Sequence, residues 1–557
     1  MSRSRFPIRT PVFALAAIAA VAVVAVVIVL VATGGGSSTP PRGPLESMFQ
    51  DDQYVLYQSN PVVVEKTLRT LKALGVERVR VQVLWVALAP DPVATKPPPG
   101  FNGADPNAYL AAGWAPYDRM VRITKSLGMG VNFDLTAPGP LWAMRQGDPD
   151  KATVADYGPS VSRFAQFVTA VARRYSGTYT PPGSHAGPLP RVNSWSLWNE
   201  PNQPGWLSPQ LRTVGGVRVP DAPRLYREYA NAGFNALVST GHGPSTDTVL
   251  IGETAPEGCI ARGPGCRYLA DDQPIAPLLF LRAMYCVDSN YKPLRGSLAI
   301  ALHCPLQGDP SAFVNANPAL FDASGYAHHP YSLVLAPNIR FPSSDVGFVS
   351  LANLSALERA LDQIFATYGV GRQLPIYLTE YGYETNPPNP VRGVSPQHQA
   401  AWLDQAQYMA WKDPRVRALS QFLLVDSLPD TKFPVNSSGY WSTFQTGLEY
   451  ANGGLKPSFL AYLLPIYLPV TSFQHGNSLL VWAMLRPAPS GSKQHALVQW
   501  RALGGGSYRT LANVTTNDAS NVLEAHVQPP GSGMIRIQWR TPAGLVLDSR
   551  PVAIQTS

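Results

Sequence analysis

Two glutamates each follow a short apolar run of the kind that forms a buried β-strand. Glu200 lies in the stretch LWNEPN at residues 197–202, and Glu380 lies in LTEYG at residues 378–382. Two carboxyl groups at one site can take different roles in an acid–base reaction, because one donates a proton while the other stays ionised. We therefore interpret Glu200 and Glu380 as a candidate catalytic pair, provided that the fold brings the two strand ends together.

Four polar residues at or near other predicted strand ends are candidates to support this pair. Asn199 immediately precedes the first glutamate, His329 and Tyr331 follow a strand in the stretch HPY, and Arg80 lies inside a strand. An arginine beside a carboxylate favours its ionised form. The alternative for Arg80 is a core arginine paired with Asp134.

Glu253 and His328 have competing interpretations. Glu253 follows a predicted strand in the stretch GET and is either a support or substrate contact of the site or a structural residue. His328 directly precedes His329, and neighbours on a strand point to opposite faces, so we predict a structural role for it. The two histidines lack a convincing third metal ligand, and we predict that the site needs neither a metal ion nor an organic cofactor.

Aromatic residues in the predicted loops could form platforms for a sugar ring. Trp142 and Trp441 are the two that we assign to substrate binding, since both lie in loops that follow predicted strands. Trp441 comes 15 positions after Asp426, the residue that follows the last predicted barrel strand. The alternative for such aromatics is that they anchor the loops in small cores.

The elements that must position these residues alternate along the chain. From about residue 45 to 468, short β-branched or aliphatic runs alternate with amphipathic stretches. Eight strand-then-helix units predict a parallel sheet that closes as a (β/α)8 TIM barrel, whose strands end together at one mouth. The predicted strands are residues 48–57, 78–84, 130–135, 192–198, 249–252, 325–329, 376–379 and 418–425. The predicted helices are residues 62–74, 117–127, 161–175, 223–239, 277–286, 351–368, 396–411 and 456–464.

The pattern changes after residue 468. Residues 469–557 contain short alternating strands separated by Gly, Ser and Pro turns, without helical periodicity. This predicts an α/β barrel followed by a small C-terminal antiparallel β-sandwich. We leave open whether the sandwich packs as a spacer or binds carbohydrate. Its predicted strands are residues 479–484, 496–500, 522–527 and 534–539.

The glutamate motifs resemble those of the clan of barrel glycoside hydrolases that includes families 5 and 39. LWNEPN is similar to the clan's motif after strand four, and LTEYG is similar to its nucleophile segment after strand seven. The resemblance implies a retaining glycosidase in which Glu200 is the general acid/base and Glu380 is the nucleophile. It further implies that Asn199 hydrogen-bonds the sugar 2-hydroxyl.

Three other elements are similar to the same clan. The stretch HPY is similar to its His-x-Tyr element, which implies that Tyr331 contacts the nucleophile and helps to keep it ionised. Arg80 is similar to an arginine found near the nucleophile in related enzymes. The position of Trp441 after strand eight is similar to that of a tryptophan beneath the reacting sugar. The similarity covers about 420 residues in architecture, but specific motifs only at four strand ends.

The N-terminal region predicts membrane targeting and export. Three arginines in the first nine residues precede an apolar run at residues 12–32, which is 21 residues long. About 20 apolar residues span a bilayer as a helix, so residues 1–33 form either an uncleaved signal anchor or a signal peptide. Residues 34–44 then read as a flexible linker. The basic flank should stay inside, which places the enzyme outside the cytoplasm, either anchored or secreted.

Charge and cysteine content agree with an exported protein. The net charge is +8 without a Lys/Arg cluster, which argues against nucleic-acid binding. The four cysteines form two neighbouring pairs, Cys259 with Cys266 and Cys286 with Cys304, and we predict two local disulfides. Zinc binding would need tighter Cys-x-x-Cys spacing. The pairing itself does not follow from the sequence.

The sequence thus predicts an extracytoplasmic retaining O-glycosyl hydrolase that acts on a poly- or oligosaccharide. Two alternatives remain open. A transglycosylase would use the same residues with an acceptor sugar in place of water. A silent surface carbohydrate-binding protein would have no need of both carboxylates. The sugar, its linkage and the oligomeric state are not encoded in any motif that we recognise.

Overall fold

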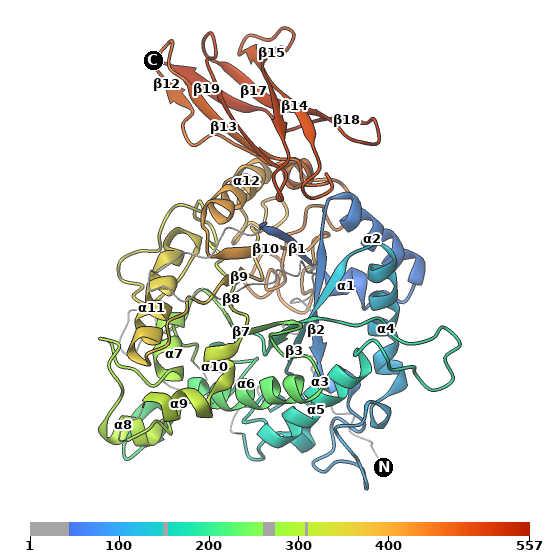
Figure 1. Cartoon of the computed structure of the whole chain (residues 1–557), viewed down its shortest axis with the longest axis vertical. Coiled ribbons are helices and arrows are strands. Elements are labelled where there is room, and N and C mark those ends of the chain that lie inside the picture. Colours follow the sequence, from blue (N-terminus) through green and yellow to red (C-terminus); the bar gives the residue numbers. More distant parts are fainter. Residues whose placement is uncertain (1–43, 149–153, 260–272, 307–309) are drawn as a thin grey trace.

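Eight parallel strands close into a barrel in the computed structural model, which describes residues 44–148, 154–259, 273–306 and 310–557. Figure 1 shows this barrel with its surrounding helices below an all-β region. The predicted (β/α)8 barrel with a C-terminal β-sandwich is therefore confirmed. The barrel strands are β1 (Glu46–Gln50), β2 (Arg78–Leu84), β3 (Gly130–Thr136), β4 (Ser194–Leu197), β7 (Thr248–Thr254), β8 (Gly325–His328), β9 (Ile376–Leu378) and β10 (Val416–Phe422).

Helices surround the barrel and bury one apolar face each. Phe164, Phe167 and Val171 repeat at helical spacing in α5 and are fully buried. Side-chain caps define several helix starts, as where Ser395 accepts from His398 N at the start of α12. The main helices are α2 (Pro61–Ala73), α4 (Ala111–Ser126), α5 (Val161–Arg174), α6 (Ala222–Ser239), α7 (Pro277–Met284), α11 (Leu354–Thr367), α12 (Pro396–Lys412) and α13 (Pro457–Leu463).

Two element boundaries differ most from the sequence prediction. The first strand ends at Gln50 rather than near residue 57, because the next residue, Asp51, caps the short helix α1 (Asp52–Val55). Helix α4 begins at Ala111 rather than at residue 117 and contains Pro116. Proline lacks a backbone N–H and usually breaks a helix interior, which is why the sequence pattern placed the helix start after it.

The C-terminal sandwich consists of two packed sheets. One holds β11 (Ile466–Tyr467), β13 (Leu479–Met484) and β16 (Val522–Val527). The other holds β12 (Ser472–Phe473), β19 (Val552–Thr556), β17 (Gly533–Arg540), β14 (Gln494–Ala502), β15 (Arg509–Thr516) and the short β18 (Val546–Asp548). Alternation is clear in β17, where Ile535, Ile537 and Trp539 are fully buried in the core between the sheets.

The sandwich packs against the barrel at the end where the strands begin. Arg486 is buried there and donates to Ser47 Oγ at 2.8 Å, to the Tyr462 carbonyl at 2.6 Å and to Gln407 Oε1 at 3.0 Å. Ser47 lies near the start of β1. A Cβ atom on Gly75, which lies just before β2, would come within 2.6 Å of the Arg486 backbone. The sandwich is thus attached away from the barrel mouth, a placement that favours a packing role (Figure 1).

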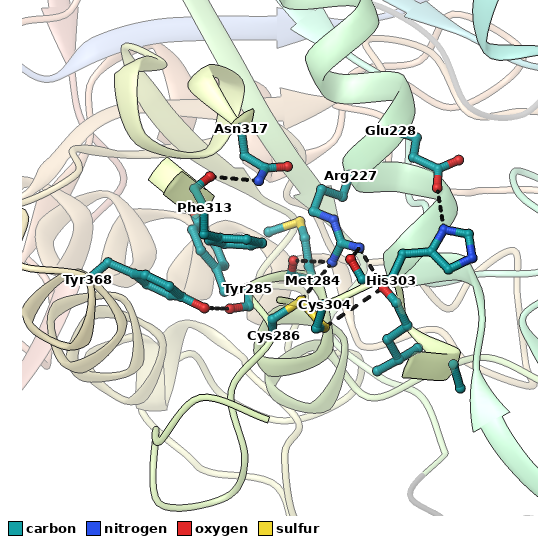
Figure 2. The surroundings of a disulfide bond; sticks show 12 residues. Arg227, Glu228, Met284, Tyr285, Cys286, His303, Cys304, Phe313, Asn317 and Tyr368 are labelled. Atoms are coloured by element: carbon teal, nitrogen blue, oxygen red, sulfur yellow. Dashed lines mark hydrogen bonds and ion pairs between the residues drawn. A yellow bond between two sulfur atoms is a disulfide. The ribbon is translucent and has the colours of Figure 1, made fainter. Parts of the chain in front are cut away.

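A disulfide stabilises the insertion that follows β7. Cys286 and Cys304 are bonded at 2.01 Å, as predicted, and Figure 2 shows Arg227 of α6 beside them. Arg227 donates to Cys286 Sγ at 3.1 Å and to the carbonyls of Met284 and Leu302 at 3.0 and 2.5 Å. The insertion also contains α8 (Gly296–Ala301), α9 (Pro310–Ala316) and α10 (Pro318–Asp322). This buried arginine therefore ties the insertion to α6.

Three sequence predictions involve residues outside the described ranges. The predicted N-terminal segment at residues 1–33, the beginning of the linker and Cys266 are not among the described residues, so the Cys259–Cys266 disulfide stays a prediction. Within the described ranges, no helix combines the length and the apolar character needed to cross a membrane.

Candidate active site

The barrel brings Glu200 and Glu380 together at its mouth. Glu200 lies three residues beyond β4 and Glu380 lies two residues beyond β9, so both follow the C-terminal ends of their strands. One oxygen of each carboxylate and Nδ1 of His329 all lie within 4.8 Å of one another. The Glu200 side chain is 20% exposed, against 5% for Glu380. The predicted convergence of the pair is present in the structure.

Unusual backbone angles place the residues after β4. Trp198 and Glu200 have φ values of 75° and 37°, a region that residues other than glycine rarely occupy. Backbone hydrogen bonds hold this turn, since Glu200 N donates to the Glu253 carbonyl at 2.9 Å and Asn199 N donates to Thr136 Oγ1 at 3.0 Å. Strained conformations held in this way concentrate at functional sites.

Glu380 is held by two hydrogen-bond donors. Arg80 Nη1 donates to its Oε1 at 2.7 Å, and the Tyr331 hydroxyl donates to its Oε2 at 3.1 Å. Both carboxylate oxygens are therefore held in a fixed orientation by donors. Burial, together with the neighbouring Glu380 charge, raises the pKa of Tyr331 well above its usual range, so the hydroxyl keeps its proton and remains a donor.

Arg80 makes the contacts expected from both of its interpretations. Its second nitrogen, Nη2, donates to Asp134 Oδ2 at 2.9 Å and to Asn199 Oδ1 at 3.0 Å, in addition to the contact with Glu380. The Asn199 amide is thereby oriented, and its buried Nδ2 has no hydrogen-bond partner among the described residues. A free, oriented N–H donor next to Glu200 is suited to a substrate hydroxyl.

His329 lies between three carboxylates. Its Nδ1 is 2.8 Å from Glu200 Oε1 and 3.7 Å from Glu380 Oε2, while its Nε2 is 2.9 Å from Glu253 Oε2. Burial alone would lower the pKa of His329, but the three neighbouring carboxylates raise it to about 10. The ring is therefore an imidazolium at neutral pH, and both of its nitrogens donate.

The surroundings of Glu200 raise its pKa above that of an ordinary glutamate. Burial raises its pKa, and the charge of Glu380 adds to this effect, while the hydrogen bond and charge of His329 oppose it. A carboxyl group with a raised pKa can retain a proton for transfer to a leaving group. Glu200 is thus suited to donate a proton.

Glu253 contacts the residues around the reacting pair, whereas His328 lies outside the reacting centre. Glu253 is fully buried and contacts His329 and Arg80. Burial lowers the pKa of His328 to about 3, and its two nitrogens contact Thr254 Oγ1 at 2.9 Å and the Val349 carbonyl at 3.0 Å. Glu253 therefore belongs to the polar network around the reacting pair, whereas His328 is a neutral residue outside it.

The spacing of Glu200, His329 and Glu380 could in principle admit a metal ion. Their donor set does not suit one, because both nitrogens of His329 carry hydrogens that bond to carboxylates. A metal ion would have to displace a proton from a ring whose pKa is raised to about 10.

The two predicted aromatic platforms have other contacts in the structure. Trp142 is 5% exposed, packs edge-on against Phe101 with ring centroids 5.0 Å apart, and donates to the Pro90 carbonyl at 3.0 Å. Trp441 packs against Tyr440, with ring centroids 5.0 Å apart. These contacts fit loop anchoring, and the sugar-stacking roles of Trp142 and Trp441 stay predictions.

Two contributors to the site were missed in the sequence. Thr379 Oγ1 donates to Glu253 Oε2 at 2.5 Å, and Gln50 Oε1 accepts from Arg80 Nη1 at 2.8 Å. Thr379 lies beside Glu380 within the strand-seven motif, which was a usable signal. Gln50 is the last residue of β1, and a glutamine at the end of a strand does not by itself indicate a site residue.

No protein-family model and no curated protein matches the sequence. Among solved structures, the chain is similar to a family 39 glycoside hydrolase from the gut symbiont Bacteroides cellulosilyticus WH2, at 14% identity over 85% of this chain and 79% of that one, with a TM-score of 0.44. It is similar to virulence factor SghA from Agrobacterium tumefaciens at 17% identity over 72% and 85%, with a TM-score of 0.41. It is also similar to a family 1 β-glucosidase from Thermotoga maritima at 15% identity over 72% and 84%, with a TM-score of 0.41. At such low identities, activity has to be inferred from the side chains of the site.

Proposed function

We propose that this protein is a retaining glycoside hydrolase that cleaves O-glycosidic bonds in an oligo- or polysaccharide. The spacing of the two carboxylates carries this proposal, since one oxygen of Glu200 and one of Glu380 lie within 4.8 Å of each other. Retaining enzymes hold their carboxyl groups about 5–5.5 Å apart, whereas inverting enzymes leave about 6.5–9.5 Å for a water molecule. The spacing therefore favours a covalent intermediate.

In the first step, Glu380 attacks the anomeric carbon while Glu200 protonates the departing glycosidic oxygen. The bond between that carbon and the oxygen breaks, and an ester forms between the sugar and Glu380. The raised pKa of Glu200 supports its role as the acid. Arg80 and Tyr331 orient Glu380 for attack through their hydrogen bonds to its two oxygens.

In the second step, water replaces the departed group. Glu200, now ionised, takes a proton from the water while the oxygen attacks the anomeric carbon, and Glu380 leaves as a carboxylate. The net result is hydrolysis with retained configuration. The His329 imidazolium stabilises Glu200 between the steps, because it donates to Oε1 at 2.8 Å.

We further propose that the enzyme works outside the cytoplasm, anchored or secreted through residues 1–33. The apolar run after a basic flank supports this location. The Cys286–Cys304 disulfide agrees with it, because disulfides persist mainly in oxidising compartments. Fractionation of cells that express the full chain, followed by N-terminal sequencing, would distinguish an anchored protein, a cleaved one and an intracellular one.

The proposed activity is tested by Glu380→Ala. We expect this variant to lose hydrolysis of the aryl glycosides and polysaccharides that the wild-type chain cleaves in a panel. Azide should partly restore turnover of an activated aryl glycoside and give a glycosyl azide of inverted configuration, because the small anion fills the space of the missing carboxylate. Product configuration is read by proton NMR.

The matched control is Glu228→Ala, which removes a glutamate from the outer helix α6. It should retain wild-type activity. Near-normal hydrolysis by Glu380→Ala, or an inverted product from the wild-type chain, would refute the proposal.

A further inference from the structure

We infer that Glu253 is a positioning residue that holds both reacting carboxylates in place without reacting itself. The inference rests on the glycosidase function proposed above and assigns a third carboxylate to the same site. Glu253 is fully buried at the end of β7, the fifth strand of the barrel.

One oxygen of Glu253 accepts three hydrogen bonds. Its Oε2 is 2.9 Å from His329 Nε2, 3.1 Å from Arg80 Nη2 and 2.5 Å from Thr379 Oγ1. The three donors come from the end of the sixth strand, the second strand and the end of the seventh strand of the barrel. Glu253 thus links elements that are distant along the chain.

Two of these donors reach the reacting carboxylates directly. His329 donates to Glu200 Oε1 at 2.8 Å through its other nitrogen. Arg80 donates to Glu380 Oε1 at 2.7 Å through its other terminal nitrogen. Each reacting carboxylate is therefore linked to Glu253 through a single side chain. The linking imidazole and guanidinium groups are planar and rigid, so the position of Glu253 constrains the positions of both carboxylates.

The backbone around Glu253 has an unusual conformation that directs its side chain toward these donors. Its φ is 47°, and the preceding Gly252 has a φ of 103°. The register between β7 and β8 shifts at this point, as in a β-bulge, which redirects a side chain. A Cβ atom on Gly252 would lie 2.6 Å from the Ala327 carbonyl oxygen, so only glycine fits there. The Glu253 carbonyl also accepts from Glu200 N at 2.9 Å.

Charge gives Glu253 its second effect. Burial raises its pKa, but Arg80 and His329 outweigh burial and lower it to about 2. Glu253 is consequently ionised throughout the working range and cannot serve as a proton donor. Its negative charge helps to keep His329 protonated, so that both imidazole nitrogens remain donors.

The test is Glu253→Gln in the full chain, which keeps the side-chain length and an acceptor oxygen but removes the charge. We expect the pKa of His329, followed by 15N NMR of histidine-labelled protein, to fall by at least about one unit. The signal is assigned by its loss in His329→Asn. This readout needs no substrate, so it remains informative if the proposed glycosidase function fails.

Kinetics provide the second readout. With an aryl glycoside whose phenol is a poor leaving group, kcat should fall about 10–100-fold, by analogy with the loss caused by removing the hydrogen-bond partner of a metal-bound histidine. KM should change little, because Glu253 does not face the substrate. With an activated dinitrophenyl glycoside the loss should be smaller, because cleavage then depends less on the proton from Glu200.

Glu228→Gln is the matched control. Glu228 also contacts one arginine and one histidine, with Arg224 Nη1 at 2.9 Å and His303 Nδ1 at 3.3 Å, but it lies on the outer helix α6. This variant should leave kcat and the pKa of His329 unchanged.

Two results would overturn the inference. One is a Glu253→Gln enzyme with wild-type kcat and an unchanged pKa of His329. The other concerns the wild-type chain and applies even if Glu253→Gln fails to fold: a His329 ring that is neutral at pH 7 would show that Glu253 does not maintain an imidazolium. Failure of the proposed activity would appear instead as an active Glu380→Ala variant.

Discussion

Glu200 and Glu380 are identical side chains with opposite surroundings. Glu380 accepts hydrogen bonds on both of its oxygens, from Arg80 and Tyr331. Glu200 has a pKa raised mainly by burial and lies at the more exposed position. The division into a nucleophile and an acid therefore follows from the neighbours and not from the residue type.

The raised pKa of Glu200 predicts an extended alkaline side of the pH profile. The acid must be protonated, so activity falls as the pH rises through its pKa, and a pKa above the ordinary 4.5 moves this fall to higher pH. In Glu200→Gln, which cannot donate a proton, the alkaline fall should disappear and kcat/KM for a poor leaving group should drop about 10²–10⁴-fold. The measurement is kcat/KM against pH for wild type and variant. An alkaline fall centred near pH 4.5 in the wild-type enzyme would contradict it.

The reacting residues were predictable, and so were the contacts of Arg80 and Tyr331 with Glu380, but the three hydrogen bonds accepted by Glu253 were not. Glu200 and Glu380 follow apolar runs at the ends of recognisable strands, so the barrel rule places them together. The Glu253 oxygen that accepts from His329, Arg80 and Thr379 owes its position to a bulge in β7. No residue pattern in the sequence predicts that bulge. Contacts between strands far apart in sequence are set by register, which the sequence shows only indirectly.

At the scale of elements, Asp51 joins the first and last strands of the barrel. It follows β1, and its Oδ1 accepts from Tyr54 N at 3.2 Å as the cap of α1. Its Oδ2 accepts from the backbone nitrogens of Leu424 and Val425, just beyond β10, at 2.9 and 3.1 Å. One buried carboxylate thus ends a strand, starts a helix and helps to close the barrel.

Asp51→Ala should destabilise the chain without touching the reacting groups. Its removal leaves buried N–H groups without acceptors, and each such group costs about 1–3 kcal/mol. We expect the free energy of unfolding in urea to fall by at least that amount for one group. Asp105→Ala is the control, because Asp105 caps only a short, partly exposed turn through Asn107 N. Equal stability of the two variants would show that Asp51 does not close the barrel.

The elements of the barrel were largely predictable from apolar runs. Seven of its eight strands lie close to the residues expected from those runs. The first strand was predicted too long, because its end depends on Asp51 and on backbone groups near residue 424. In the sandwich, the predicted strands did not include β11, β12, β15, β18 and β19. Two of these strands, β15 and β19, alternate weakly and expose much of their length.

At the scale of the whole molecule, Arg486 fastens the sandwich to the barrel. Its guanidinium lies 4.0 Å from the centre of the Tyr462 ring and donates to three groups of the barrel region. Arg550 adds an ion pair with Asp404 of α12. The two regions therefore share a buried polar interface in addition to apolar contacts.

Arg486→Met should loosen this interface. Hydrogen bonds from a charged donor contribute about 1.5–3 kcal/mol, and Met cannot replace them. We expect a lower midpoint of thermal unfolding for the full chain, with unchanged kcat at temperatures where the protein is folded, since the interface lies away from Glu200. The control is Arg540→Met, whose exposed arginine donates only to the Gly544 carbonyl within the described residues. A loss of kcat in the folded Arg486→Met enzyme would show that the sandwich acts on the site.

The described chain enters the barrel at the end where the strands begin, and this affects how a membrane-anchored enzyme would present its active site. Leu45 lies beside the sandwich, where its N–H donates to Ser520 Oγ at 3.0 Å, and β1 then runs toward the mouth. If residues 12–32 hold the protein in a membrane, as the sequence predicts, the polypeptide enters the enzyme from the side opposite Glu200 and Glu380. Together with the predicted flexible linker at residues 34–44, this entry point leaves the barrel mouth accessible to glycans in the surrounding medium or on a neighbouring surface.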